Sequence, residues 1–293
     1  MWCDRLDADT YTDHSVIAFA KQHLNSIKID AEKGDGIELA KKYNIRGFPT
    51  IVFLDSSGEE IDRMVGYRPP DTFLQELERI RAGRNTFPAL LSEFEKDPTL
   101  FRTLFTLANK YEKKGDILSA KLMVDAILEA GTDSAGTAEF YSILYNARET
   151  RDPQQLVQYA DAHPDGERVV KSLREAMYIL RREKKEPELE ASLYIRLINL
   201  SDKPSPNECN SFAWRMSQLE IQLEMALDKV TWAVANAPDE NQKYMFIDTK
   251  AEVLWKMGRV DEAISEIEKC RQGKPEDDYY RKQEEKFRQS MNT

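Results

Sequence analysis

The residue best suited to covalent chemistry stands almost at the start of the sequence, at Cys3. It begins a segment of helical character with several aspartates in its first turns, and a helix N-terminus favours a thiolate. The other two cysteines, Cys209 and Cys270, lie far from it and from each other, so the spacing shows neither a disulfide framework nor a metal-ligand set. The three histidines are isolated. We therefore expect no metal site, and we expect Cys209, in a Pro-rich connection, and Cys270, between paired helices, to serve packing.

A second feature is a proline directly before an apolar run. Phe48-Pro49-Thr50 follows a helix-like segment at residues 36–43 and leads into residues 51–54, which are all apolar. Proline donates no hydrogen bond to a strand ladder, so Pro49 must take the first position of the strand, in a bend that has to be fixed. A cis Phe48–Pro49 peptide bond is one way to fix the bend, and a trans proline at a strand start is the other.

These features, together with others in the same order, resemble the thioredoxin superfamily over about residues 1–83. Trp2-Cys3-Asp4-Arg5 matches the second half of a C-x-W-C site, and residues 26–30 match a strand ending in aspartate. Phe48-Pro49-Thr50 matches the bend, residues 51–54 match an apolar strand, and Gly66-Tyr67 matches the end of a hairpin. The resemblance implies an α/β thioredoxin-like domain with a cis-proline facing redox-active cysteines. It also implies thiol–disulfide oxidoreductase chemistry on protein thiols and disulfides, without a cofactor.

The resemblance assigns a role to each site residue. Cys3 takes the second cysteine slot, that of the resolving cysteine, and Trp2 flanks the disulfide and limits its contact with solvent. A substrate backbone is expected to dock beside Phe48, Pro49 and Thr50.

The first, nucleophilic cysteine of the family lies three residues before the second, which falls just before Met1. We interpret Met1 as an internal methionine of a Cys-Met-Trp-Cys sequence, so that the thioredoxin-like domain is truncated and lacks its first strands. A natural one-cysteine form is the alternative. Without a partner thiol Cys3 cannot complete a cycle on one chain, so we predict no disulfide reductase activity for the chain as written.

Composition limits the function classes. The 293 residues carry a formal net charge of −10, with 41% hydrophobic and 32% charged residues, which fits a soluble, helix-rich protein of two domains. The acidic balance argues against nucleic acid and anionic membrane surfaces as partners. No apolar run approaches the ~20 residues of a membrane span. The compartment stays open: periplasmic or secreted if a signal peptide is missing from the sequence, and cytoplasmic otherwise.

The pattern of the first 84 residues predicts alternating helices and strands. Helices are expected at 15–24, at 36–43 and from Pro69-Pro70-Asp71 onward, and strands at 27–30, 51–54 and 61–65. Asp13 is the expected N-cap of the first of these helices. The apolar run 51–54 predicts a strand covered on both faces. Residues 81–85 end the last helix, so we place the domains at 1–84 and 85–293.

From residue 87 onward no strand is predicted, and apolar residues recur at helical spacing. Three stretches resemble tetratricopeptide repeats, in which small residues let two antiparallel helices approach closely and a turn separates them. Their small residues and turn residues include Ala108, Gly115, Ala120, Ala213, Ala226, Ala251, Gly258 and Ala263. Residues 133–204 are helical but degenerate. The charged run 181–186 is most simply a solvated helix end. The resemblance implies an α-solenoid that binds a protein or peptide partner.

Two functions follow. The first is a thiol–disulfide oxidoreductase with a helical-repeat binding module, inactive as the chain is written. The second is a redox-silent scaffold protein that works through its helical repeats. If a central strand is missing, residues 1–45 are expected to exchange amide hydrogens fast while residues 104–267 stay protected.

Overall fold

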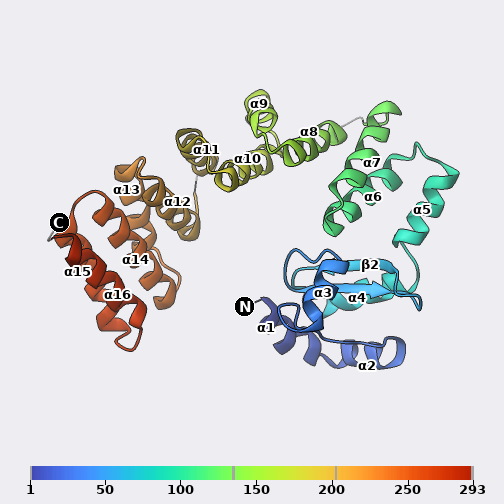
Figure 1. Cartoon of the computed structure of the whole chain (residues 1–293), viewed down its shortest axis with the longest axis horizontal. Helices are drawn as coiled ribbons and strands as arrows, with labels where there is room; N and C mark the ends of the chain where they lie inside the picture. Colours follow the sequence, from blue (N-terminus) through green and yellow to red (C-terminus); the bar gives the residue numbers. More distant parts are fainter. Residues whose placement is uncertain (1, 134–135, 202, 292–293) are drawn as a thin grey trace. The chain divides into compact units, whose positions relative to one another are not determined.

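The computed structural model describes residues 2–133, 136–201 and 203–291, and the chain divides into two compact units, one up to Thr150 and one from Arg151 (Figure 1). The first unit contains α1 (Trp2–Ala8), η1 (Thr10–Thr12), α2 (His14–His23), α3 (Asp35–Lys42), β1 (Thr50–Leu54), β2 (Glu60–Val65), α4 (Pro70–Arg81), α5 (Phe87–Lys96), α6 (Phe101–Lys114), α7 (Ile117–Glu129) and α8 (Thr137–Thr150). The second contains α9 (Gln154–Ala162), α10 (Val169–Glu183), α11 (Pro187–Asn199), α12 (Pro206–Leu219), α13 (Leu223–Ala235), α14 (Glu240–Lys256), α15 (Val260–Gly273) and α16 (Asp278–Ser290). A small sheet among helices followed by a helical stretch confirms the predicted fold class.

Strands β1 and β2 form an antiparallel hairpin, which is the whole sheet within the described ranges. Thr50 lies opposite Val65, and the register shifts between Phe53 and Leu54, next to the turn. The Asp55 carboxylate holds that turn by accepting hydrogen bonds from two backbone N–H groups of the next four residues, each at 2.9 Å.

A hydrophobic core joins the hairpin to α1, α2 and α4. Its buried members are Leu6, Val16, Phe53, Met64, Phe73, Leu77 and Ile80.

Local sequence sets the helix starts. The Asp13 carboxylate accepts hydrogen bonds from the backbone N–H groups of Ser15 and Val16, which confirms the predicted N-cap of α2. Pro70 takes the first position of α4, where its missing N–H leaves no partner unsatisfied.

Two strand predictions are wrong. Residues 24–30, which include the predicted strand 27–30, have no regular secondary structure, and Ile27 is 82% exposed. Alternating apolar and polar residues form a strand only beside another strand that pairs with them, and in the described chain β1 pairs with β2 alone. Strand β1 is also not covered on both faces. Phe53 is its one buried residue and Leu54 is exposed, because the core covers only the face that carries Ile51 and Phe53.

Strand β2 contacts helix α6 through buried charges. The Asp62 side chain is 2% exposed, and its carboxylate binds Lys110 Nζ at 2.6 Å and Arg79 Nη2 at 2.8 Å. Arg63 is buried beside Glu60, with Nη2 and Oε2 2.6 Å apart, and it also donates to a carbonyl oxygen at the end of α6. Helix α6 therefore packs on the hairpin through ion pairs.

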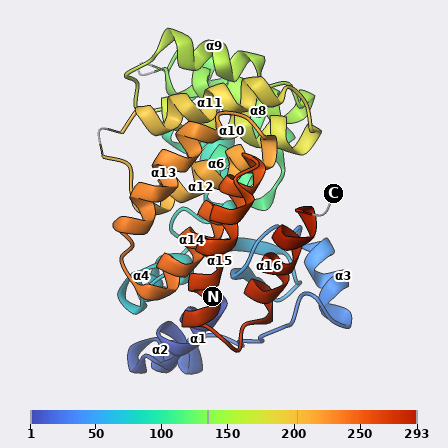
Figure 2. The same ribbon diagram turned by 90° about the vertical axis from the view of Figure 1, so that its left-hand side faces the viewer.

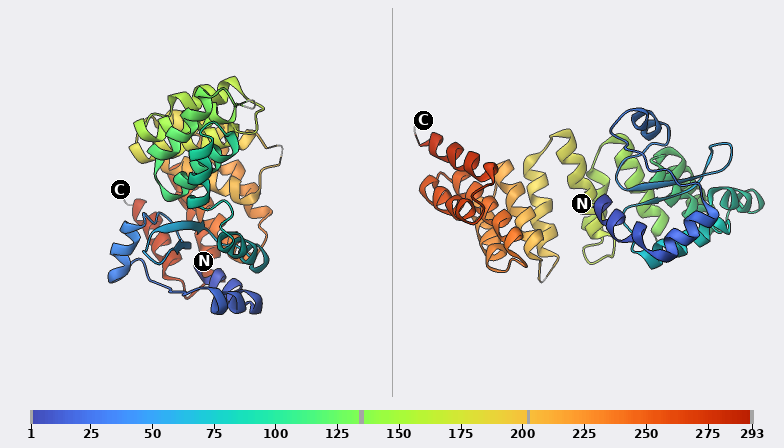
Figure 3. Two further views of the ribbon diagram at one scale, coloured as in Figure 1. Left: turned by 90° about the vertical axis from the view of Figure 1, so that its right-hand side faces the viewer. Right: turned by 90° about the horizontal axis from the view of Figure 1, so that it is seen from below.

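Packing between successive helices builds the remainder of both units. Figure 2 shows α14, α15 and α16 side by side, and the panel of Figure 3 seen from below shows the helices of the second unit following one another in chain order. The small residues expected at the helix crossings are fully buried: Ala108, Ala120, Ala213, Ala226, Ala251 and Ala263. Gly115 ends α6 with a φ of 75°, and Gly258 has a φ of 76° between α14 and α15. These left-handed conformations suit glycine at a turn between paired helices.

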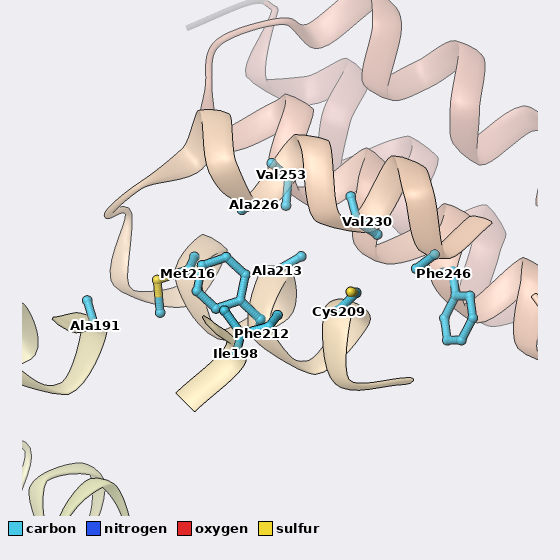
Figure 4. Packing of buried hydrophobic residues seen from close by; sticks show 11 residues of the cluster. Ala191, Ile198, Cys209, Phe212, Ala213, Met216, Ala226, Val230, Phe246 and Val253 are labelled. Atoms are coloured by element: carbon cyan, nitrogen blue, oxygen red, sulfur yellow. The ribbon is translucent and has the colours of Figure 1, made fainter. Parts of the chain in front are cut away.

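Cys209 lies inside α12, and the prediction that placed it in the preceding connection is wrong. It is buried in a cluster with Phe212, Ala213 and Met216 (Figure 4). The cluster spans α11 to α14, so this cysteine packs between helices.

Candidate thiol site in the N-terminal domain

Cys3 is an exposed free thiol in the first turn of α1. The helix is fixed by aromatic contacts on both sides of the cysteine. The Trp2 ring, 53% exposed, stacks on Tyr67 with centroids 6.1 Å apart, and the Arg5 guanidinium lies 4.5 Å from the centre of the same Tyr67 ring. The Tyr67 hydroxyl donates to the carboxylate of Asp9. This hydrogen bond, followed by desolvation, raises the pKa of Tyr67.

Tyr11 lies in η1, directly after the helix that carries the thiol. Burial raises the pKa of the Tyr11 hydroxyl, and the negative charges of Asp7 and of a Cys3 thiolate add to the effect. The Tyr11 ring meets Phe73 of the hydrophobic core edge-on, with centroids 5.9 Å apart. This contact holds η1, which follows the thiol helix in the chain, on the domain core.

The Phe48-Pro49-Thr50 bend is held on both sides by hydrogen bonds. Pro49 is buried and its peptide bond with Phe48 is cis. The Thr50 hydroxyl donates to the Gly47 carbonyl oxygen at 2.7 Å, and the Gly66 N–H donates to the Pro49 carbonyl oxygen at 2.9 Å. Phe48 is left 51% exposed. The bend thus offers an aromatic side chain to solvent on a fixed backbone.

The turn after β2 connects these two parts of the site. Gly66 bonds the backbone of Pro49, and the next residue, Tyr67, stacks on Trp2. The sequence pattern assigned Gly66-Tyr67 only to the end of the hairpin. The contact of Tyr67 with α1 could not be found from the sequence, because stacking between two rings that lie 65 positions apart leaves no local pattern.

The segment before α3 is tied to the thiol helix. Lys28 Nζ lies 2.6 Å from the Asp7 carboxylate of α1, although both side chains are largely exposed. Exposed pairs of this kind add little stability. The Asp30 carboxylate accepts the backbone N–H of Glu32, and this bond, followed by one from Lys33, lowers the pKa of Asp30.

The other two cysteines lie outside this site and are buried. Burial raises the pKa of the Cys209 thiol. Burial and the charges of Asp248 and Glu266 raise the pKa of the Cys270 thiol to about 12, and its sulfur lies 3.4 Å from the Tyr244 carbonyl oxygen. Both thiols stay protonated at neutral pH, as packing residues do. Within the described ranges, no group of three or more His, Cys, Asp or Glu side chains has the arrangement of a metal site.

The N-terminal part of the chain is similar to thioredoxin-like proteins. The family described as thioredoxin-like domain matches residues 2–81. The thiol:disulfide interchange protein DsbD of Yersinia pestis is 34% identical over 83 residues, 27% of this chain and 14% of that protein. The disulfide bond reductase DsbH of Chlamydia pneumoniae is 28% identical over 78 residues, 24% of this chain and 46% of that protein.

The chain thus spans less than half the length of these relatives. Across the described residues, every helix is too short or too polar to cross a membrane. Residues 2–81 are a thioredoxin-like domain, distantly related to disulfide interchange and disulfide reductase proteins.

Proposed function

We propose that the protein takes part in thiol–disulfide exchange with other proteins, and that Cys3 is the resolving cysteine of this exchange. The observation that carries the proposal is the exposed Cys3 thiol within a segment that matches the thioredoxin-like family. The relatives with similar sequence are named for disulfide interchange and disulfide reduction.

The proposed chemistry has two steps and needs two sulfurs. A first thiolate attacks the substrate disulfide, forms a mixed disulfide and releases one substrate thiolate, which takes up a proton. The Cys3 thiolate then attacks the first sulfur, so that a disulfide forms within the domain and the second substrate thiolate leaves. The substrate gains two electrons and the two domain thiols lose them. The resemblance places the first sulfur three positions before Cys3.

The proposed docking place of the substrate is the bend formed by Phe48, Pro49 and Thr50. The exposed Phe48 ring offers apolar contact beside a backbone that hydrogen bonds hold in place. Strand β1 follows at once, and its edge away from β2 has no strand partner in the described part of the chain. Such an edge can accept an extended substrate backbone through main-chain hydrogen bonds.

The helical region would bind a protein partner or present a substrate to the thiol site. The support is its construction from successive packed helix pairs with small residues at their crossings, as in tetratricopeptide-like solenoids. We place the junction between the two modules at residues 84 and 85. Since α5 and α6 contact β2 across this junction, the modules are joined by packing as well as by the chain.

Insulin reduction by dithiothreitol tests the proposal. The 293-residue chain should give no turnover above background, and an extended chain with a Cys-Met-Trp-Cys motif should give turnover that Cys3→Ser abolishes. A Cys209→Ala, Cys270→Ala variant of the extended chain, checked for folding by circular dichroism, is the matched control and should keep its activity.

Two outcomes contradict the proposal. If the 293-residue chain gives turnover and Cys3→Ser abolishes it, Cys3 itself attacks the substrate disulfide and is not only the resolving cysteine. An extended chain that is folded and still inactive would favour the redox-silent binding protein.

A further inference from the structure

Helices α10, α11 and α12 of the second unit enclose a pocket of about 470 Å³, which we call the α10–α12 pocket. Its inner wall is apolar and includes the buried side chains of Met177, Ile198 and Phe212. This volume lies within the range of ~300–1,000 Å³ that is usual for ligand sites. The inner wall therefore suits an apolar side chain of a binding partner.

Charged and aromatic side chains of α10 line the same pocket. Arg174, Tyr178 and Arg181 follow one another at spacings of four and three residues, which places them on one side of the helix. Tyr178 is 56% exposed, and its hydroxyl accepts a hydrogen bond from Arg182 at 3.1 Å. Two positive charges thus flank an exposed ring beside an apolar hollow.

Both arginines keep hydrogen-bonding capacity for a ligand. Among the described residues, Arg174 pairs with Glu208 at 4.0 Å, and this carboxylate also lines the pocket. One of its oxygens already accepts hydrogen bonds from the N–H and the hydroxyl of Ser205 in the N-terminal cap of α12. Arg181 Nε lies 3.5 Å from Glu190, whose two oxygens Arg215 holds at 2.7 and 2.6 Å. A guanidinium has five N–H donors, so, counting the partners among the described residues, most donors of Arg174 and Arg181 are open to another carboxylate.

Helix α12 adds uncharged polar groups to the pocket. Asn207 and Ser211 lie one turn apart, are exposed and line the pocket. Within the described residues neither side chain makes a hydrogen bond. An amide and a hydroxyl in this position can bind the backbone of an extended peptide.

We propose that the α10–α12 pocket binds a peptide segment of a protein partner in which an apolar side chain stands next to a carboxylate. The apolar side chain would enter between Met177 and Phe212, and the carboxylate would bind Arg174 and Arg181. This inference rests on the proposed binding role of the helices and adds the chemistry of the partner. Charge complementarity favours a partner with a carboxylate, because two arginines with open donors line a pocket on a chain of net charge −10.

Fluorescence anisotropy with two pools of labelled twelve-residue peptides tests this. Both pools carry one leucine or phenylalanine, flanked by glutamates in one pool and by lysines in the other. The chain should bind the glutamate pool more tightly, and added salt should weaken this binding. The double variant Arg174→Ala, Arg181→Ala should weaken it about tenfold or more, since both charge pairs are lost. Arg174→Glu with Arg181→Glu should reverse the preference between the pools.

The matched control is Lys185→Ala, which removes one exposed positive charge two residues after α10, outside the pocket lining. It should bind like the unaltered chain. Equal binding of both pools, or no binding of either, would overturn the proposal. Arginine-dependent binding of phosphatidylserine vesicles in place of peptides would also overturn it. Insulin reduction by the extended chain is measured separately, so failure of the peptide proposal and failure of the exchange proposal remain distinguishable.

Discussion

Replacing Lys110 by methionine tests whether ion pairs hold helix α6 on strand β2. The change keeps most of the side-chain volume and removes the charge that lies 2.6 Å from the Asp62 carboxylate. Loss of one partner of a buried ion pair typically costs ~3–5 kcal/mol, because the other charge stays buried. Asp62 retains Arg79 at 2.8 Å and the Arg63 N–H at 2.8 Å. We therefore expect a smaller loss of ~1–3 kcal/mol, that of one charged hydrogen bond.

Hydrogen exchange read by mass spectrometry is the suitable assay, because a chain of two units need not unfold in one step. A loss of ~1–3 kcal/mol in local opening free energy speeds exchange of β2 and α6 roughly 5–150-fold. Lys114→Met is the matched control. Its ammonium lies 3.8 Å from Glu60 and its side chain is 39% exposed, so we expect a change below ~0.5 kcal/mol.

A double-mutant cycle with Asp62→Asn isolates the pair itself. The coupling free energy between positions 62 and 110 should be ~1 kcal/mol or more, as for residues in direct contact within one network. A coupling below ~0.5 kcal/mol, or equal effects of the changes at 110 and 114, would refute the reasoning.

Three further predictions concern other parts of the fold. Gly115→Trp and Ala263→Trp should each lower the midpoint of thermal unfolding, because overpacking costs ~1–3 kcal/mol, and unchanged midpoints in both variants would count against the packed helix pairs. Burial raises the pKa of Asp248, and hydrogen bonds from Tyr279 and Gln283 oppose this only in part. The folded state therefore binds the proton of the Asp248 carboxyl more tightly than the unfolded state. In urea titrations, the unaltered chain should lose stability relative to Asp248→Asn as the pH rises from about 4 to 8. A constant difference in stability between the two chains over this range would contradict this. Amides of residues 24–30 should exchange faster than those of α6 and α15, since this segment has no strand partner, and uniform protection would be the contrary result.

The sequence was sufficient where a structure depends on neighbours along the chain. The Asp13 cap of α2, the proline start of α4 and the glycine turn after α6 are all set within a few residues, and the sequence predicts all three. The paired helices followed from small residues at helical spacing, because those residues decide how closely two helices approach.

The failures involve partners distant in the chain. Residues 27–30 alternate like a strand, but no local pattern tells whether another strand lies beside them. The buried charge of Asp62 depends on Lys110, 48 positions later. The charged run 181–186 is the solvated helix end that the sequence predicts, since α10 ends at Glu183, but the sequence does not show that Arg181 also lines a pocket whose other wall begins at Tyr194. In each case the deciding contact is tertiary.

The register of the β1–β2 hairpin has a consequence for the geometry of the thiol site. Because Thr50 faces Val65, the flanking residues Pro49 and Gly66 are brought together, and Tyr67 is directed to the helix that carries Cys3. The irregularity after Phe53 lies at the far end of the hairpin, toward the turn. Variation in turn length can therefore be absorbed there, away from the chemistry. A single residue inserted within β2 would turn every following side chain to the other face and detach the bend from the thiol helix. The pairing of β1 with β2 thus fixes the position of the Phe48-Pro49-Thr50 bend relative to α1, whatever the length of the loop between the two strands.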